Sequence, residues 1–117
     1  MQRDMELIRN ILFDLEKKKE PGWCNLEYDG YTKDQVSYHI KLAYQAGLIE
    51  ARDVSTFEGM DWWAGDLTWQ GHEFLDAVRN DTVWNKVKNK VAEQGGNLPF
   101  DIVKALAIKF VGNIVGI

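Results

Sequence analysis

At 117 residues the chain is long enough to bury one ordinary core, and its 45% hydrophobic and 27% charged content is typical of a globular domain. Its one cysteine, Cys24, excludes an internal disulfide, and no apolar run reaches the roughly 20 residues that span a bilayer, so we expect a cytoplasmic protein without a membrane segment. The formal charge of −4 is uneven, because residues 21–80 carry four basic groups against ten acidic ones.

The first predicted helix lies within residues 3–22. Its apolar residues recur at spacings of three and four and so share one face: Met5, Ile8, Leu12 and Leu15. The lysines at 17–19 fall in its last turn, where cations favour the negative end of the helix dipole, and we interpret them as a solvated helix end rather than a binding site. Pro21-Gly22 ends the helix.

Residues 23–31 predict one short strand and a turn at Asp29-Gly30. Thr32 then predicts the start of a second helix, with Gln35 completing a capping box. Gly47 predicts the end of this helix, because glycine readily adopts the left-handed conformation that closes helices. The residues expected to face inward are Val36, Ile40, Leu42 and Ala43.

The next segment predicts a β-hairpin with arms at residues 49–57 and 62–68 and with turn or bulge sites at Glu58-Gly59 and Ala64-Gly65. Three helices follow. We expect Thr68 to cap the third, Asn80 or Asp81 to cap the fourth, and Pro99 to lie in the first turn of the fifth. The fifth carries a broad apolar stripe: Val103, Leu106, Ala107, Phe110, Val111 and Ile114.

Helix, strand, helix and hairpin follow one another here in the order of a winged helix. The run VSYHIKL at residues 36–42, followed by AGLI at 46–49, resembles the recognition helix and first wing strand of bacterial winged-helix repressors of the metal-sensor type. The chain departs from that pattern at Ala43, where a large aliphatic residue is usual. It also departs at residues 21–32, which predict a strand in place of the turn-forming helix.

A second resemblance spans nearly the full chain. The segments RDMELIRNIL, YHIKLAYQAGLIEA, LTWQGHEFLDAVRNDTVWNKVK and GGNLPFDIVKALA, in that order, are similar to a bacterial and phage-borne family known as domain of unknown function 2513. The resemblance implies a winged-helix-like fold and a bacterial or prophage genome, and it implies no activity. We therefore predict an α+β, mainly helical domain, with a winged-helix-like core at residues 1–80, the hairpin as its wing, and a helical extension at 81–117 packed on the same domain.

The second helix is a candidate DNA-binding element. Its expected outward face carries side chains that can contact phosphates or base edges of duplex DNA: Lys33, Ser37, Tyr38, Lys41 and Gln45. The alternative is that these are the ordinary polar residues of an exposed helix. Charge opposes DNA binding, because the hairpin from Arg52 to Asp66 has one basic group against four acidic ones, whereas DNA affinity comes largely from neutralising phosphates.

A protein partner is the other hypothesis, and the acidic charge favours it slightly. Met60, Trp62 and Trp63 lie in the hairpin, and Met and aromatic residues are enriched in the cores of interfaces. Because side chains alternate along a strand, we expect one of the two tryptophans to pack on the body and the other to be exposed or to cover another element. Phe110 and Ile114 of the last helix are a second candidate surface, either for a homodimer or for closing the core over the first helix.

The sequence predicts neither a catalytic cluster nor a metal site. Cys24, His39 and His72 are isolated residues without the paired short spacings of a zinc site. We interpret His39 as a partly buried helix residue bonded to a neighbour. The predicted function is therefore non-enzymatic binding of a macromolecule without a cofactor, as a protein adaptor or, alternatively, as a transcriptional regulator on DNA.

Overall fold

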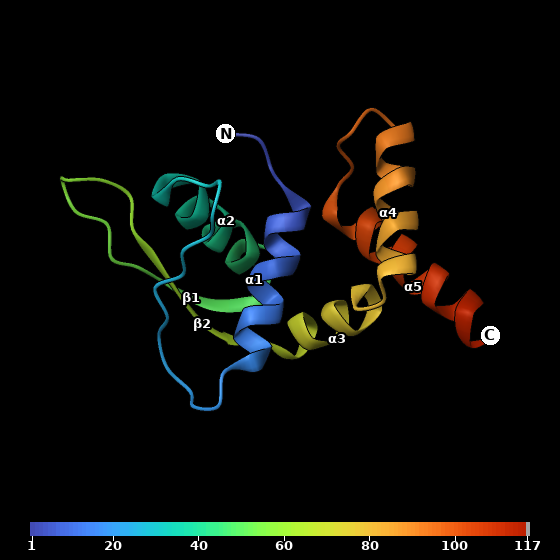
Figure 1. The fold of residues 1–117 in the computed structure, drawn as a ribbon, viewed down its shortest axis with the longest axis horizontal. Coiled ribbons are helices and arrows are strands. Elements are labelled where there is room, and N and C mark those ends of the chain that lie inside the picture. The colour runs from blue at the N-terminus through green and yellow to red at the C-terminus, as the bar shows by residue number, and fades with distance from the viewer. Residues whose placement is uncertain (117) are drawn as a thin grey trace. The chain divides into compact units, whose positions relative to one another are not determined.

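The computed structural model describes residues 1–116. Over these residues the chain forms five helices and one two-stranded antiparallel hairpin, which confirms the predicted α+β, mainly helical class (Figure 1). The elements follow in the order α1 (Met5–Lys17), α2 (Lys33–Gln45), β1 (Ile49–Asp53), β2 (Trp62–Leu67), α3 (Trp69–Val78), α4 (Asp81–Glu93) and α5 (Phe100–Val115). No helix among these residues is both long and apolar enough to cross a bilayer.

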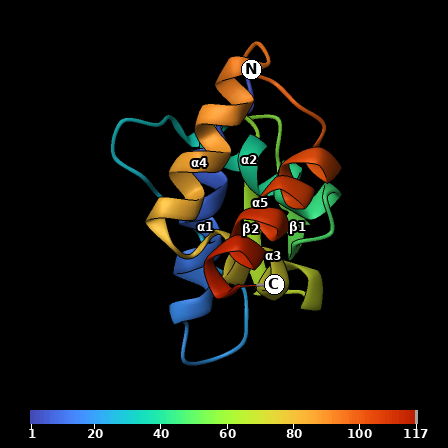
Figure 2. The ribbon, with the colours of Figure 1, turned by 90° about the vertical axis from the view of Figure 1, so that its right-hand side faces the viewer.

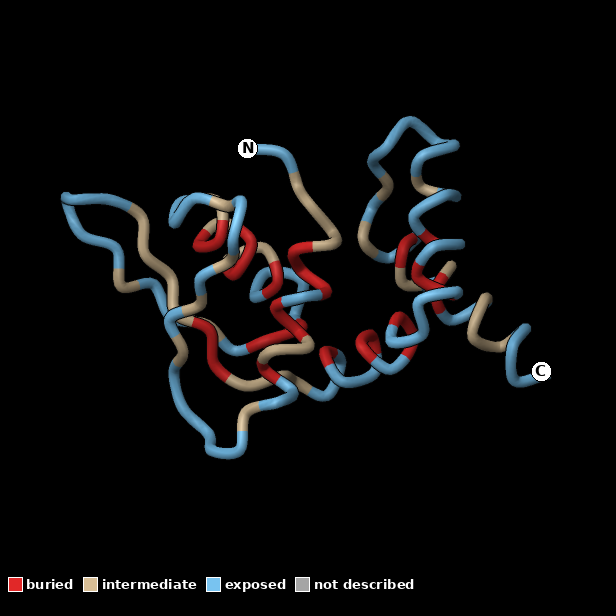
Figure 3. The backbone as a smooth tube through the Cα atoms, viewed as in Figure 1, coloured by how far each residue is buried: buried red, intermediate tan, exposed pale blue. Residues whose placement is uncertain are grey.

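The chain divides into two compact units that meet within α3, one ending at His72 and the other beginning at Glu73. The predicted packing of residues 81–117 on the core as one domain stays a prediction. In the first unit, α1 and α2 pack against each other and against the hairpin (Figure 3). The fully buried side chains at the centre of this unit come from all of these elements: Leu7, Ile11, Leu12, Ile40, Ala43, Leu48, Ile49 and Ala64.

Both ends of α2 form as the sequence predicts. Thr32 Oγ1 accepts a hydrogen bond from the Gln35 N–H, and the Gln35 side chain accepts one from the Thr32 N–H, which completes the capping box. At the other end Gly47 has a φ of 78°. Its N–H donates to the Tyr44 carbonyl at 2.9 Å, and the Leu48 N–H donates to the Ala43 carbonyl at 3.0 Å. This Schellman arrangement turns the chain directly into β1.

The hairpin contains a bulge at the predicted glycine. Ile49 pairs with Leu67 and Ala51 pairs with Ala64, so two residues of β2 lie opposite Glu50 alone. Gly65 is one of these two, and a Cβ atom there would lie only 3.0 Å from the ring of Trp23, closer than most side-chain contacts. The missing side chain at Gly65 therefore lets the segment that joins α1 to α2, residues 18–32 and called the linker below, pack closely on β2.

The predicted strand at residues 23–31 is reduced to a single bridge. The Cys24 N–H donates to the Ala64 carbonyl at 2.7 Å, and the Ala64 N–H donates to the Cys24 carbonyl at 3.0 Å. Pairing does not extend along β2, because the Trp62 N–H on the same edge donates to Ser37 Oγ at 3.1 Å instead. Residues 18–32 contain no helix, so the turn-forming element of a helix-turn-helix is absent from this described segment.

Side chains hold this linker in place. The hydroxyl of Tyr28 donates to the Asp14 carboxylate at 2.6 Å, and the hydroxyl of Tyr31 donates to the Asp4 carboxylate at 2.6 Å. Asp4 also caps α1, accepting hydrogen bonds from the N–H groups of Glu6 and Leu7. The linker is therefore fastened to both ends of α1.

The interpretation of the lysines at 17–19 as a solvated helix end is wrong for Lys18. Its side chain is only 15% exposed, and its Nζ lies 2.9 Å from the Asp66 carboxylate. The same ammonium group donates to the carbonyl oxygen of Gly22. The helix ends where the chain turns back toward β2, so this side chain meets the hairpin rather than solvent.

The second unit is built on α4 and α5, which pack against each other (Figure 2). Asn80 caps α4 as predicted, because its Oδ1 accepts from the N–H groups of Thr82 and Val83. The rings of Phe74 and Phe100 lie 5.0 Å apart between centroids. The buried residues of α4 and α5 are Val83, Trp84, Val87, Val103 and Ala107.

Candidate macromolecule-binding surface

The five α2 residues predicted to contact DNA do not share one exposed face. Lys33 and Gln45 are exposed, and Tyr38 and Lys41 are half-buried. Ser37 is only 3% exposed, and its Oγ accepts the hydrogen bond from the Trp62 N–H. The predicted outward orientation of Ser37 is wrong, because the hairpin packs on the side of α2 that carries this residue.

Two acidic side chains of the hairpin, Asp61 and Asp66, form ion pairs with lysines of the first unit. The Lys33 ammonium group lies 3.4 Å from the Asp61 carboxylate, and Lys18 pairs with Asp66. Hydrogen bonds from Ser55 lower the pKa of Asp53, and the positive charge of Lys41 contributes in the same direction. Lys18 and Lys33 are therefore engaged with carboxylates of the hairpin itself.

The adjacent tryptophans are both half-buried, and neither is fully exposed. The ring of Trp62 lies 6.1 Å from the ring of Tyr44 on α2. The indole Nε1 of Trp63 is buried without a hydrogen-bond partner among the described residues, and so is one carboxylate oxygen of Asp61. Met60 is half-buried as well. Each of the three residues predicted as a protein-binding patch is therefore partly covered by the rest of the protein.

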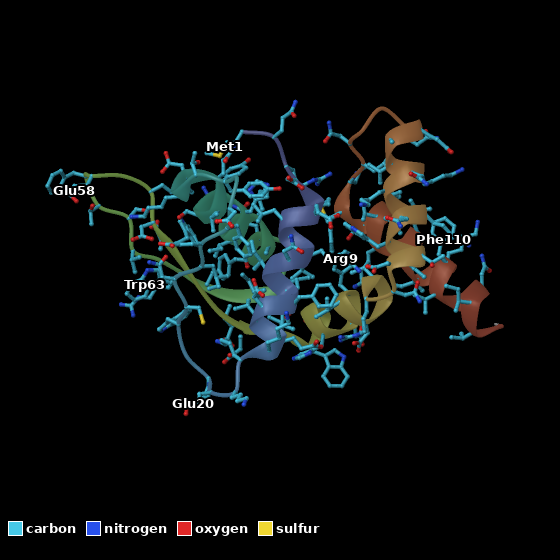
Figure 4. The ribbon with its side chains drawn as sticks, in the orientation of Figure 1. Met1, Arg9, Glu20, Glu58, Trp63 and Phe110 are labelled. Atoms are coloured by element: carbon cyan, nitrogen blue, oxygen red, sulfur yellow. The ribbon has the colours of Figure 1, made fainter. Side chains whose placement is uncertain are left out.

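Sequence reasoning missed the most exposed aromatic residue of the hairpin, Phe57. Its side chain is 99% exposed. The predicted arm extended to this residue, but β1 ends at Asp53, so Phe57 lies in the projecting loop next to Glu58, which Figure 4 labels at the tip. The sequence signal for this exposure was an aromatic residue placed directly before the Glu58-Gly59 turn. Trp69, at the start of α3, is also exposed, at 76%.

In the second unit, Phe110 is half-buried and Ile114 is 51% exposed. Of the predicted apolar stripe of α5, only Val103 and Ala107 are fully buried, and the last turns of the helix leave the side of α4 (Figure 1). Phe110 therefore contributes partly to the core of this unit, whereas Ile114 does not.

His39 is 2% exposed, and both of its ring nitrogens are engaged. Nε2 accepts a hydrogen bond from the Asp4 N–H at 2.8 Å, and Nδ1 lies 2.7 Å from the Gln35 carbonyl oxygen. Because the Gln35 carbonyl oxygen can only accept, Nδ1 is the ring nitrogen that donates in this contact. Residues 1–116 hold no cluster of three or more His, Cys, Asp or Glu side chains placed to bind a metal ion.

A family model described as "Hypothetical protein (DUF2513)" matches residues 2–97. The chain belongs to this family. The matched range contains α1 to α4 and ends before α5 begins at Phe100.

The chain is also similar to an "Uncharacterized protein" of Haemophilus influenzae, with 42% identity over 117 residues that cover 98% of this chain and 99% of the relative. That similarity extends through α5. No solved structure matches the chain.

Proposed function

We propose that this member of the domain of unknown function 2513 family is a cytoplasmic, non-enzymatic protein-binding module whose contact surface is the tip of the hairpin. The observation that carries the proposal is the exposure of Phe57, 99% accessible beyond the end of β1. Large aromatic side chains that become buried on binding contribute much of the affinity of protein interfaces. A ring held in water at a projecting tip is therefore suited to insert into a pocket of a partner.

The loop that carries Phe57 is ordered by its own hydrogen bonds. The Val54 N–H donates to the Asp61 carbonyl at 2.9 Å, and the Asp61 N–H donates to Ser55 Oγ at 2.9 Å. Closer to the tip, Thr56 and Gly59 exchange backbone hydrogen bonds of 3.1 Å. A loop that is already ordered loses less conformational entropy on binding, which favours affinity.

The charge of the tip indicates the chemistry of the partner. Glu58 follows Phe57 directly and is exposed, and the carboxylate of Asp53 lies at the base of the same loop with a lowered pKa. Opposite charges around an aromatic anchor speed association and fix its orientation. The fitting surface is an apolar pocket with basic side chains on its rim.

A winged-helix transcriptional regulator remains the second candidate, supported by the exposed Lys33 and Gln45 and the half-exposed Tyr38 and Lys41 along α2. Electrostatics oppose it. Residues 33–67 carry three basic groups against six acidic ones. Lys33 is also paired with Asp61, and a phosphate would have to displace that carboxylate.

Site-specific photocrosslinking tests the proposal. A photoreactive phenylalanine analogue at position 57 should crosslink to a partner protein in the source bacterium, whereas the same analogue at the exposed linker residue Glu27 should not. The identified partner, once purified, should bind the chain, and Phe57→Ser should weaken that binding at least about tenfold, the loss of one buried aromatic anchor. Equal crosslinking at both positions, or equal affinity of Phe57→Ser, would contradict the proposal.

A DNA-binding measurement separates the two candidates. Fluorescence anisotropy of a labelled random duplex at low salt should remain unchanged at micromolar protein if the hairpin binds protein alone. A salt-sensitive rise that Lys41→Glu abolishes would instead support the regulator.

A further inference from the structure

Helix α5 carries a second face that is distinct from the one it buries. Val103 and Ala107 face inward and are 1% and 0% exposed. The residues on the other side are all exposed: Asp101, Ile102, Ala105, Ile108 and Lys109. Ile102 and Ile108 are 47% and 56% exposed, so the outer face presents two large aliphatic side chains to solvent.

These five residues form one stripe along the helix. With 3.6 residues per turn, they fall within about 120° around the helix axis, and Ala105 lies at the centre of that arc. The stripe is called the outer face of α5 below. It does not include Phe110 or Ile114, which by helical spacing lie on the same side of the helix as Val103 and Ala107.

The outer face has a symmetric pattern about Ala105. An isoleucine lies three residues before it and another three residues after it. Four residues away the two charges are opposite, with Asp101 before Ala105 and Lys109 after it. If two copies of this face meet antiparallel across a two-fold axis at Ala105, Ile102 of one copy lies at the level of Ile108 of the second copy, and Asp101 lies at the level of Lys109 of the second copy. The two members of each pair approach from opposite sides of the contact line between the helices.

We propose that the chain self-associates through the outer face of α5, as an antiparallel pair of helices with Ala105 at the two-fold axis. A two-fold interface requires a surface that complements itself, and this face does so in both apolar contacts and charge. The small side chain of Ala105 lies where the two helices approach most closely, which favours short helix packing distances. The pairing buries both exposed isoleucines and neutralises two acid–base pairs.

A single helix pair is a small interface. Stable interfaces bury about 1,200–2,000 Å² in total, and smaller ones are typical of reversible association. We therefore expect a monomer–dimer equilibrium that depends on protein concentration. This association uses residues of the second unit alone and is independent of the hairpin tip.

Charge reversal tests both the association and its direction. Sedimentation equilibrium of the full chain should show a dimer whose association constant falls at least about tenfold in Asp101→Lys and in Lys109→Asp, because each change opposes like charges twice. The double variant Asp101→Lys with Lys109→Asp should regain the association, because exchanging the charges preserves every opposed pair. Lys86→Asp on α4 changes the net charge as Lys109→Asp does and should leave the equilibrium unchanged.

Two outcomes would overturn the proposal. A chain that stays monomeric up to millimolar concentration has no such interface, and a double variant that fails to recover excludes the antiparallel register. Circular dichroism of each variant checks that the fold is retained.

Crosslinking provides an independent measurement. With Cys24→Ser as background, Ala105→Cys should give a dimer with a short bismaleimide, because the two thiols meet at the axis. Asn89→Cys, exposed on α4, is the matched control and should remain monomeric. Equal dimer yields from the two positions would contradict the placement of Ala105 at the interface.

Discussion

The backbone N–H of Asp4 donates a hydrogen bond to Nε2 of His39 across 2.8 Å. This contact joins the N-terminal end of α1 to the middle of α2, over 35 positions in sequence. Nδ1 of the same ring bonds the Gln35 carbonyl one turn earlier, so the imidazole is held in one orientation. His39 is therefore a buried structural connection between the two helices.

Replacing this histidine tests its structural role. In His39→Leu the Asp4 N–H loses its partner while the position stays apolar, and we expect the free energy of unfolding to fall by about 1–3 kcal/mol. Urea denaturation followed by circular dichroism measures the change. His72→Leu is the matched control, since His72 is exposed, and should shift stability by no more than about 0.5 kcal/mol. Equal effects of the two substitutions would argue against a structural hydrogen bond.

Gly71 lies where α3 starts against the turn after α2. A Cβ atom at this position would lie within 2 Å of the Leu48 carbonyl oxygen, which itself accepts a hydrogen bond from the Thr68 N–H at 3.0 Å. Because backbone has to move to make room, Gly71→Ala should destabilise the protein by about 3 kcal/mol or prevent folding. Thermal unfolding measures this, with the exposed neighbour Gln70→Ala as control. A melting temperature unchanged by Gly71→Ala would show that α3 starts elsewhere.

Acidification should weaken the connection made by Asp4. Partial burial alone would raise the pKa of this carboxyl, but the hydrogen bond from Tyr31 and those from the N–H groups of Leu7 and Glu6 together hold the pKa below its ordinary value of 3.8. A carboxyl with a lowered pKa in the folded state stabilises the fold at pH above 3.8, and this contribution is lost as the pH falls through the folded-state pKa.

Comparing Asp4→Asn with the native chain measures that contribution. Asparagine still caps α1 but cannot titrate, so the loss of stability between pH 6 and pH 3 should be smaller in Asp4→Asn. Urea denaturation at both pH values measures the free energy of unfolding. The variant Asp29→Asn, at an exposed position, is the control and should behave like the native chain. If the native chain and Asp4→Asn lose the same stability, Asp4 is not the group that titrates.

The two linker tyrosines, Tyr28 and Tyr31, should ionise only at a more alkaline pH than an ordinary tyrosine. Burial and the hydrogen bond to Asp14 raise the pKa of Tyr28 well above its usual range, and the hydrogen bond to Asp4 raises the pKa of Tyr31. A raised pKa in the folded state means that the stabilisation is complete below pH 10 and is lost as the pH rises further. In an ultraviolet titration of the folded protein, we expect two of the four tyrosines to ionise later than the others.

Phenylalanine substitution assigns these two groups. Tyr28→Phe removes the donor to Asp14 and should lower the free energy of unfolding by about 1–2 kcal/mol at neutral pH. It should also remove one of the late steps from the titration. Tyr38→Phe on α2 serves as the comparison, and an unchanged titration of Tyr28→Phe would contradict the assignment.

The sequence by itself determined the local elements of this chain. The capping box of Thr32 and Gln35, the glycine at the end of α2, the bulge at Gly65 and the cap at Asn80 all form as predicted. Each depends on residues within a few positions of one another, so its physics is visible in a short stretch of sequence. Family membership was equally accessible, because it rests on long segments in a fixed order.

Only the tertiary structure decided which polar groups face solvent. Helical spacing predicted an exposed Ser37, and a run of lysines in the last turn of a helix predicted a solvated Lys18. The hairpin covers Ser37, and Lys18 pairs with Asp66. Phe57 became the most exposed aromatic residue because β1 ends four residues before it, and the end of a strand depends on what its edge can pair with. Burial and pairing are set by elements that are distant in sequence, and so the candidate surface could be located only once those elements had been brought together.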